Sequence, residues 1–386
     1  MKPYKMECGK IASLAVAGIL ALGATPLMAT TIVPGDYAKS FAITFPGYSG
    51  SETLTDFPVL VKVSAARNDF DYSACQVANG GDLRFADASG NLLSSEVDTW
   101  NTSGESLVWV KVPSFSKDTV ITAYYGNANP PAVTASDVWS NGYVGVWHLN
   151  ESAAPLAESS GISTPFKVPV NVTDRTTYAA NGVAGSKSVS FYNDGYTSGI
   201  YRRLEADDDP DLRGLTNFTV ECWTYQTVYR DDNAATILGA KDNWKISQSK
   251  TTGFMAARWL RDASTTVFGP ESSSAPAQNE WTHSTFVRNY TSDSKADCKW
   301  YLNGAENYLW RENNPQATGN GSAVTISLGG GDSIRVFPGS IDEARVSNVA
   351  RSADWVKATH DTVTEPSFAK YGAAIENKTG IIIFVR

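Results

Sequence analysis

Short apolar runs bounded by turn-forming residues recur along residues 37–129, and no helical period of useful length is visible there. The run at 107–112 is rich in residues that favour strands. Near the end of the chain, the segment IDEARV at 341–346 interleaves charged and apolar residues, which is typical of a half-buried strand. A turn follows, and residues 352–354 begin a short helix that carries Trp355. These patterns predict an all-β fold with almost no helix.

The first unit extends over residues 37–129 and is predicted to be an antiparallel β-sandwich. Its expected strands lie at residues 41–45, 57–63, 83–86, 107–112 and 120–125. Turn-rich joins separate these strands, as at NGGD (79–82) and SGN (89–91).

Residues 130–138 form the predicted linker, because Pro130 and Pro131 disfavour helix and stiffen the join. The second unit is expected to occupy residues 139–361. Residues 362–386 are expected to be a C-terminal tail that ends in a short apolar segment.

Residues 1–29 predict a signal peptide and not a part of the fold. Lys2, Lys5 and Lys10 form a positive start, and the apolar segment 11–23 is too short to span a bilayer comfortably. Ala29 is the small residue at the expected cleavage point. We therefore expect an exported protein that is periplasmic, on the cell surface or extracellular, with no later transmembrane segment. The alternative is an uncleaved membrane anchor.

Composition narrows the classes of partner. The 386 residues are enough for two domains, and the formal net charge is −8. Nucleic acid is therefore not an expected partner, because its binding needs a basic face.

Four segments of the second unit carry a family pattern in order. They are NFTVECWTY (217–225), EWTHSTFVRN (280–289), KWYLNG (299–304) and GSIDEARV (339–346). They resemble the laminin-G-like domains of the concanavalin A-like jelly-roll superfamily, whose pattern runs fTvxxW, W-x-H, lYxNG and G-x-I-D-E-x-R. The resemblance implies a jelly-roll β-sandwich and a structural role for His283 in the W-x-H pattern.

The first unit resembles domain of unknown function 2341. The matching segments are DFPVLVKVS (56–64), GDLRFAD (81–87), SEVDTWN (95–101), VWVKVPS (108–114) and TAYYGN (122–127). This resemblance implies a fold and no chemistry. In exported bacterial proteins the family commonly precedes a laminin-G-like domain.

Removal of the signal peptide would leave three cysteines, Cys75, Cys222 and Cys298, so at least one is unpaired. A disulfide between Cys222 and Cys298 is one alternative if their strands are neighbours, and two separate buried thiols are the other. No C-x-x-C motif exists to support a zinc or redox site.

The laminin-G-like resemblance also implies a structural calcium ion. Asp342 matches the acidic ligand on the closing strand, and the backbone carbonyls of Asn150 and Glu151 are the expected companions. Calcium takes six to eight oxygen ligands, so the alternative is an Asp342 carboxylate held by loop amides. The acidic run at 207–211 lacks the EF-hand spacing and is expected to be a solvated loop.

Glu96 and Asp98 begin the segment EVDTWN, which is similar to the E-x-D-x-x-E motif of jelly-roll glycosidases of family 16. Asn101 stands where that motif has its acid, so no group would protonate the leaving oxygen. The segment also lies outside the predicted jelly roll. We therefore predict no catalytic residue.

Four aromatic residues are flanked by polar and charged residues, as rings that stack on sugar faces would be. They are Tyr229, Trp244, Trp259 and Trp310. The alternative is that such rings cap the core from a strand edge.

These features favour a non-catalytic exported protein that binds a glycan or a protein of the cell surface or envelope. The first sandwich would be a spacer or a second recognition domain. Two alternatives stay open: a glycoside hydrolase or lyase that uses the jelly-roll cleft, and a structural or adhesion component of the cell envelope. Because fold does not fix function, the ligand class rests on the resemblance alone.

Overall fold

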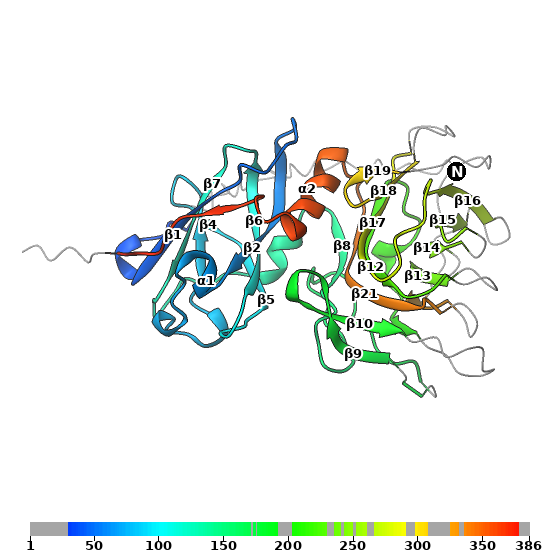
Figure 1. The fold of residues 1–386 in the computed structure, drawn as a ribbon, viewed down its shortest axis with the longest axis horizontal. Helices are drawn as coiled ribbons and strands as arrows, with labels where there is room; N and C mark the ends of the chain where they lie inside the picture. Colours follow the sequence, from blue (N-terminus) through cyan, green and yellow to red (C-terminus); the bar gives the residue numbers. More distant parts are fainter. Residues whose placement is uncertain are drawn as a thin grey trace, which may run out of the picture.

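The computed structural model describes residues 30–170, 173–174, 176–191, 203–229, 235–240, 243–249, 252–260, 266–290, 298–307, 325–331 and 336–377. In these residues the paired strands form four antiparallel sheets in two units, and the sheets lie one behind another along the longest axis (Figure 1). The all-β sandwich architecture predicted from the sequence is confirmed.

The first unit is a sandwich of a larger and a smaller sheet. The larger sheet contains β1 (Lys39–Thr44), β3 (Arg84–Ala86), β4 (Leu92–Leu93), β7 (Val120–Tyr125), β22 (Lys370–Tyr371) and β23 (Ile375–Glu376). The smaller sheet contains β2 (Leu54–Val63), β5 (Ser95–Thr99) and β6 (Ser106–Phe115). The short helix α1 (Ala65–Asn68) follows β2.

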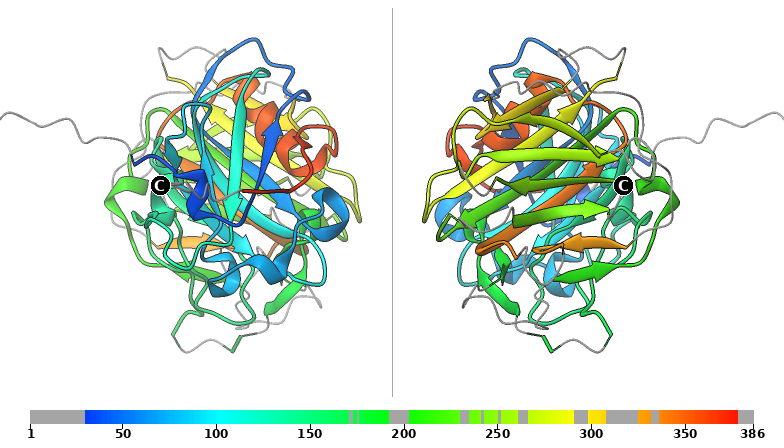
Figure 2. Two further views of the ribbon diagram at one scale, coloured as in Figure 1. Left: turned by 90° about the vertical axis from the view of Figure 1, so that its left-hand side faces the viewer. Right: turned by 90° about the vertical axis from the view of Figure 1, so that its right-hand side faces the viewer.

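The second unit is the larger sandwich. Its inner sheet, next to the first unit, contains β8 (Tyr143–Trp147), β9 (Thr176–Asn181), β10 (Lys187–Phe191), β12 (Phe218–Gln226), β17 (Trp281–Arg288), β18 (Cys298–Leu302), β19 (Ala305–Glu306) and β21 (Gly339–Ser347). Its outer sheet contains β11 (Leu204–Ala206), β13 (Ala235–Ala240), β14 (Trp244–Gln248), β15 (Met255–Leu260), β16 (Thr266–Glu271) and β20 (Ile326–Leu328). Figure 2 (right) views the molecule from the side of this outer sheet, whose strands cross the front.

Short 3₁₀ helices occupy several of the connections. They are η1 (Pro34–Asp36), η2 (Tyr72–Ala74), η3 (Ala78–Gly80), η4 (Ala135–Trp139), η5 (Val183–Gly185) and η6 (Pro210–Leu212). The predicted linker thus ends in η4, whose Trp139 is fully buried.

Helix α2 (Ala353–Thr364) lies between the two units (Figure 1). Ser352 caps it by accepting a hydrogen bond from the backbone N–H of Trp355. Trp355 packs edge-on against Phe57 of β2, with 5.0 Å between ring centroids. The Thr362 hydroxyl accepts the backbone N–H of Leu60 at 3.0 Å. The expected helical start is therefore a twelve-residue helix that joins the units.

The C-terminal segment differs from the prediction of a separate tail beyond residue 361. β22 and β23 both pair with β1, and the Tyr371 hydroxyl accepts the backbone N–H of Lys62 at 2.9 Å. Residues beyond 377 lie outside the described part of the chain. The chain therefore leaves the first unit, builds the second and returns to complete the first.

Candidate functional site

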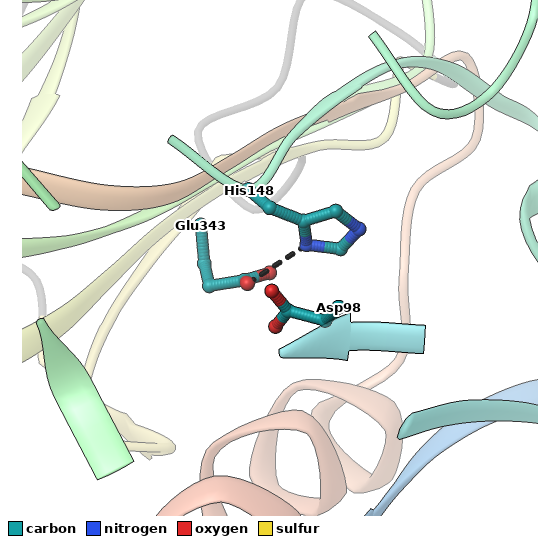
Figure 3. Close-up of side chains that lie close together, drawn as sticks. All are labelled: Asp98, His148 and Glu343. Carbon is teal, nitrogen blue, oxygen red and sulfur yellow. Dashed lines mark hydrogen bonds and ion pairs between the residues drawn. The ribbon is translucent and has the colours of Figure 1, made fainter. Parts of the chain in front are cut away.

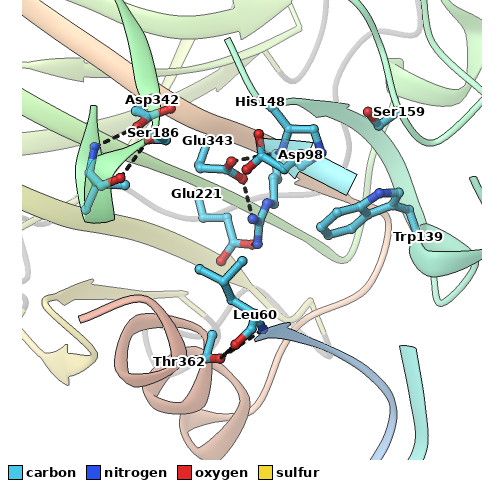
Figure 4. Close-up of polar contacts among 12 residues, drawn as sticks. Leu60, Asp98, Trp139, His148, Ser159, Ser186, Glu221, Asp342, Glu343 and Thr362 are labelled. Atoms are coloured by element: carbon cyan, nitrogen blue, oxygen red, sulfur yellow. Dashed lines mark hydrogen bonds and ion pairs between the residues drawn. The ribbon is translucent and has the colours of Figure 1, made fainter. Parts of the chain in front are cut away.

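Charged side chains gather where the smaller sheet of the first unit faces the inner sheet of the second (Figure 4). We call this set the interface network and define it as Glu96, Asp98, His148, Glu221, Glu343 and Arg345. Glu96 and Asp98 come from β5, and the other four come from the second unit. The network thus spans the boundary between the units.

His148 is the centre of the network. It directly follows β8 and is buried. Its Nδ1 lies 2.8 Å from Oε1 of Glu343, and its Nε2 lies 3.3 Å from Oε2 of Glu96. Burial alone would lower the pKa of His148, but the charges of Glu343, Asp98 and Glu96 outweigh burial and raise this pKa well above its usual range. The imidazole is thus held between a carboxylate of each unit.

A β-bulge positions Glu343. Glu221 and Trp223 of β12 pair with Arg345 and Asp342, so β21 has one extra residue between these two pairs, and Glu343 in this bulge has a positive φ of 50°. The side chains of Asp342 and Glu343 therefore point to different places: Asp342 contacts the segment 183–186, and Glu343 contacts His148. Glu343 also forms an ion pair with Arg345.

Arg345 extends from β21 to Trp109 of the first unit. Its guanidinium lies over the ring of Trp109, 4.2 Å from the centroid, and over the ring of Trp139 at 4.8 Å. Such cation–π contacts are favourable in a desolvated site. Oε1 of Glu221 lies 3.8 Å from the same guanidinium.

Asp98 and Glu96 are the two partly exposed members of the network. The Asp98 carboxylate accepts the side-chain amide of Asn150 at 2.5 Å. Burial raises the pKa of Asp98 to about 6, although the positive charge of His148 acts against this shift. Asp98, His148 and Glu343 each offer one ligand atom, and these atoms lie within 4.8 Å of one another (Figure 3). This geometry is compatible with a metal ion or with a proton-sharing cluster.

Glu96 and Asp98, which the glycosidase comparison singled out, are committed to contacts with the second unit. Glu96 accepts the indole N–H of Trp139 at 2.6 Å and the hydroxyl of Ser159 at 2.8 Å. Asn101, at the third motif position, accepts a backbone N–H of its own turn at 3.1 Å. The structure therefore uses this segment to join the units.

Asp342 has the contacts of a loop clamp, the second of its two alternatives. Its Oδ2 accepts the backbone N–H of Val183 at 2.8 Å and the hydroxyl of Ser186 at 2.6 Å, whereas Oδ1 is buried without a partner. Burial, together with the charge of Glu343, raises the pKa of Asp342 well above its usual range.

The side chains of Asn150 and Glu151, whose backbone carbonyls were the expected companions of Asp342, have partners of their own. Asn150 donates to Asp98, and Oε1 of Glu151 accepts the backbone N–H of Ala157 at 2.6 Å. The loop held by Asp342 is therefore at 183–186 and not the loop after Leu149. Calcium binding by Asp342 stays a prediction.

Cys222 and Cys298 form no disulfide in the described part of the chain. β12 and β18 both pair with β17, so the two strands are not neighbours of each other. Strands two positions apart in a sheet are separated by roughly 10 Å, whereas bridged cysteines have Cα atoms about 4.4–6.8 Å apart. The alternative of separate buried thiols is the one observed.

The four rings predicted to stack on sugars differ in their exposure, and two of the side chains lie outside the described part of the structure. Tyr229 is 37% exposed. Trp244 is buried in the core of the second unit and donates its indole N–H to the carbonyl of Leu212 at 2.8 Å, so it is a core residue. Trp259 lies on β15 opposite Trp244, and its side chain lies outside the described atoms. Trp310 lies outside the described residues.

The comparisons with known proteins agree with this architecture of a small sandwich followed by a jelly roll. Residues 194–357 match the family model of the concanavalin A-like lectin/glucanases superfamily. Residues 79–141 match the domain of unknown function DUF2341. The chain thus carries a concanavalin A-like domain preceded by a DUF2341 domain. No curated protein sequence matches the chain.

Several solved structures are similar to part of the chain at low sequence identity. The binding domain of Paraclostridial Mosquitocidal Protein 1 is 16% identical, with a TM-score of 0.42 over 57% of this chain and 52% of that chain. Domain 4 of AbnA, an extracellular arabinanase from Geobacillus stearothermophilus in complex with arabinotriose, is 19% identical, with a TM-score of 0.44 over 57% and 98%. The chain spans about half the length of the first of these structures.

Within the described residues, no helix has both the length and the apolar character needed to cross a membrane.

Sequence reasoning missed His148, Glu343 and Arg345 as a set. The sequence separates His148 from Glu343 by nearly two hundred residues, and only the return of β21 beside β8 brings them together. The sequence contained two relevant signals. A histidine directly follows an apolar strand, and an acidic pair lies inside another strand. Both are unusual in buried sheets.

Proposed function

We propose that this chain is a non-catalytic binding protein that recognises carbohydrate through its second unit. The match of residues 194–357 to the concanavalin A-like lectin/glucanases superfamily supports this proposal. The inner sheet faces the first unit, which leaves the ends of the sandwich and the outer sheet for a ligand.

The observation that carries the proposal is the setting of Tyr229. Its hydroxyl donates to the carbonyl of Pro276 at 2.7 Å. One face of its ring covers Gly253, where an added Cβ would lie 2.9 Å from the ring. The ring is therefore fixed while 37% of the residue stays exposed. A fixed and exposed aromatic ring is a platform on which a sugar face can stack.

A buried pair of glutamines supports this platform. Gln226 of β12 and Gln248 of β14 exchange side-chain amide hydrogen bonds across the two sheets of the sandwich. Gln226 also donates to the carbonyl of Val228, and Gln248 donates to the carbonyl of Gly253 at 2.9 Å. The pair thus holds both the segment that carries Tyr229 and the glycine beneath its ring.

The hydrolase alternative is weaker because its candidate carboxylates serve the interface. A retaining glycosidase needs an acid and a nucleophile that flank the scissile bond. Glu96 instead accepts hydrogen bonds from Trp139 and Ser159 and lies against His148. We therefore propose that the protein turns over no polysaccharide. We also propose that it is exported, on the basis of the signal-like segment at 1–29.

A glycan array probed with the mature protein, with and without calcium, tests the proposed function. We expect binding to a defined glycan that Tyr229→Ala weakens at least tenfold. Tyr229→Phe is the matched control, because it keeps the ring and removes only the hydroxyl, and it should bind within about threefold of the wild type. An array with no signal above background, or equal binding by the alanine variant, would overturn the proposal.

A further inference from the structure

We propose that Asp98, His148 and Glu343 bind a divalent transition-metal ion that joins the two units. Asp98 belongs to β5 of the first unit, and His148 and Glu343 belong to the second. The inference is independent of the proposed carbohydrate site, because the described contacts of Tyr229 involve none of these residues.

The three side chains have the donor types and the spacing of a metal site. Two carboxylates and one imidazole offer ligand atoms that all lie within 4.8 Å of one another. Both carboxylates lie on the same side of the His148 ring (Figure 3). Ligands at about 2.1 Å from a tetrahedral zinc ion are roughly 3.4 Å from each other, so small side-chain shifts would close the site. A fourth position is left for water or for a further oxygen.

Each proposed ligand is held by an outer partner, as ligands of metal sites usually are. Nε2 of His148 faces Glu96 at 3.3 Å, which leaves Nδ1 directed at Glu343. Glu343 is paired with Arg345 through its second oxygen. Asp98 accepts the amide of Asn150. The carboxylate–histidine pairing in particular fixes the ring orientation that metal coordination requires.

The charges of the network also point to a bound cation. Glu96, Asp98 and Glu343 surround one imidazole, and Arg345 is shared between Glu343 and Glu221. The four carboxylates of the network thus exceed the three cationic groups that face them, even when His148 is protonated and Arg351, which acts on Glu221, is counted. Buried charge without compensation is unfavourable, and a divalent ion would balance it. The partly exposed Asp98 offers the entry path.

The donor set selects the class of ion. A histidine nitrogen suits zinc and its neighbours in the first transition row, whereas calcium takes oxygen ligands. The site is therefore distinct from the calcium predicted at Asp342, whose carboxylate is directed at Val183 and Ser186.

Equilibrium dialysis of the full-length protein against micromolar zinc, with bound metal measured by mass spectrometry, tests the proposal. We expect one zinc ion per chain. Asp98→Asn should reduce the affinity at least a hundredfold, because it removes one of three ligands. Asp118→Asn, on an exposed turn of the same unit, is the matched control and should bind like the wild type.

A second variant keeps the test decisive if Asp98→Asn is poorly folded. Glu96→Gln should weaken zinc binding about ten- to a hundredfold, as removal of an outer partner does. Cobalt-loaded wild-type protein should show visible absorption bands of a site with a histidine ligand, and His148→Gln should lose them. No retained zinc at micromolar concentration, or wild-type affinity in a folded Asp98→Asn or Glu96→Gln variant, would overturn the proposal.

Discussion

The two faces of the inner sheet of the second unit are both buried but chemically opposite. One face carries Val220, Phe286 and Val346 into the apolar core of the jelly roll. The other face carries Glu221 and Arg345, which the first unit covers. The same strands therefore contribute to an apolar core on one side and to a charged layer on the other.

The difference shows how this protein joins its units. An apolar core is stabilised by the apolar area that it removes from water, and it can be packed with several different combinations of apolar side chains. A buried charged layer is stable only when each group meets its own partner, so it specifies one arrangement of the units. We infer that the interface network fixes how the units are oriented, while helix α2 and β22 provide much of the apolar and backbone contact.

The largest expected effect is on the apolar face. Trp300 is fully buried, packs 5.3 Å from Phe286 between ring centroids, and donates to the carbonyl of Pro270. Trp300→Ala should lower the free energy of unfolding by about 3–5 kcal/mol through the cavity that it leaves. Urea denaturation measures this change. A loss below about 1 kcal/mol would show that the jelly-roll core is not packed as described.

The charged face should give the next largest effect. Arg345→Met leaves Glu343 and Glu221 without their common cation, which should cost about 3 kcal/mol in the free energy of unfolding. Introducing Glu221→Gln as well should recover at least about 1 kcal/mol of this loss, because one carboxylate no longer needs a partner. Additive losses in a double-mutant cycle would contradict a coupled network.

The sequence predicted the fold well where alternation and turn residues act locally. The strands expected at 57–63 and 120–125 appear as β2 and β7, and the interleaved segment at 341–346 lies within β21. Glu343 and Arg345 of β21 are buried, although the interleaved pattern indicated a half-buried strand. They are buried because the first unit covers them, and period-two patterning contains no information about a covering domain.

The candidate site was less predictable because its residues meet only through long-range pairing. His148 meets Glu343 because β8 pairs with β21, and it meets Glu96 because the two units pack together. Trp244 shows the same limit in reverse. Its charged sequence neighbours favoured an exposed ring. In the structure, the alternate residues Trp244, Ile246 and Gln248 of β14 are all buried, and the first two belong to the apolar core of the second unit.

A smaller effect separates the two roles considered for Asp342. Asp342→Ala should cost about 1–3 kcal/mol in either role, because Val183 and Ser186 lose a buried acceptor. Only if Asp342 binds calcium should calcium added to metal-free wild-type protein also raise Tm. The corresponding gain in the free energy of unfolding is roughly 2.7 kcal/mol at a hundredfold excess of calcium over Kd. No response to calcium would leave the loop clamp, and a variant that melts like the wild type would contradict both roles.

The smallest expected effect is at Asp361 on helix α2. Burial acts to raise the pKa of Asp361, but hydrogen bonds from His360 and Lys357 outweigh burial and hold this pKa below its usual value. A lowered carboxylate pKa stabilises the folded state above the unfolded pKa, near 3.9, and this contribution is lost as the pH falls through the lower folded value. At pH 7, Asp361→Asn should therefore cost about 0.5–1 kcal/mol, and the difference from the wild type should shrink below about pH 4. Urea melts of both proteins from pH 7 to pH 3 measure this, with Asp118→Asn as the exposed control. A difference that stays constant with pH would show that packing, and not charge, accounts for the loss.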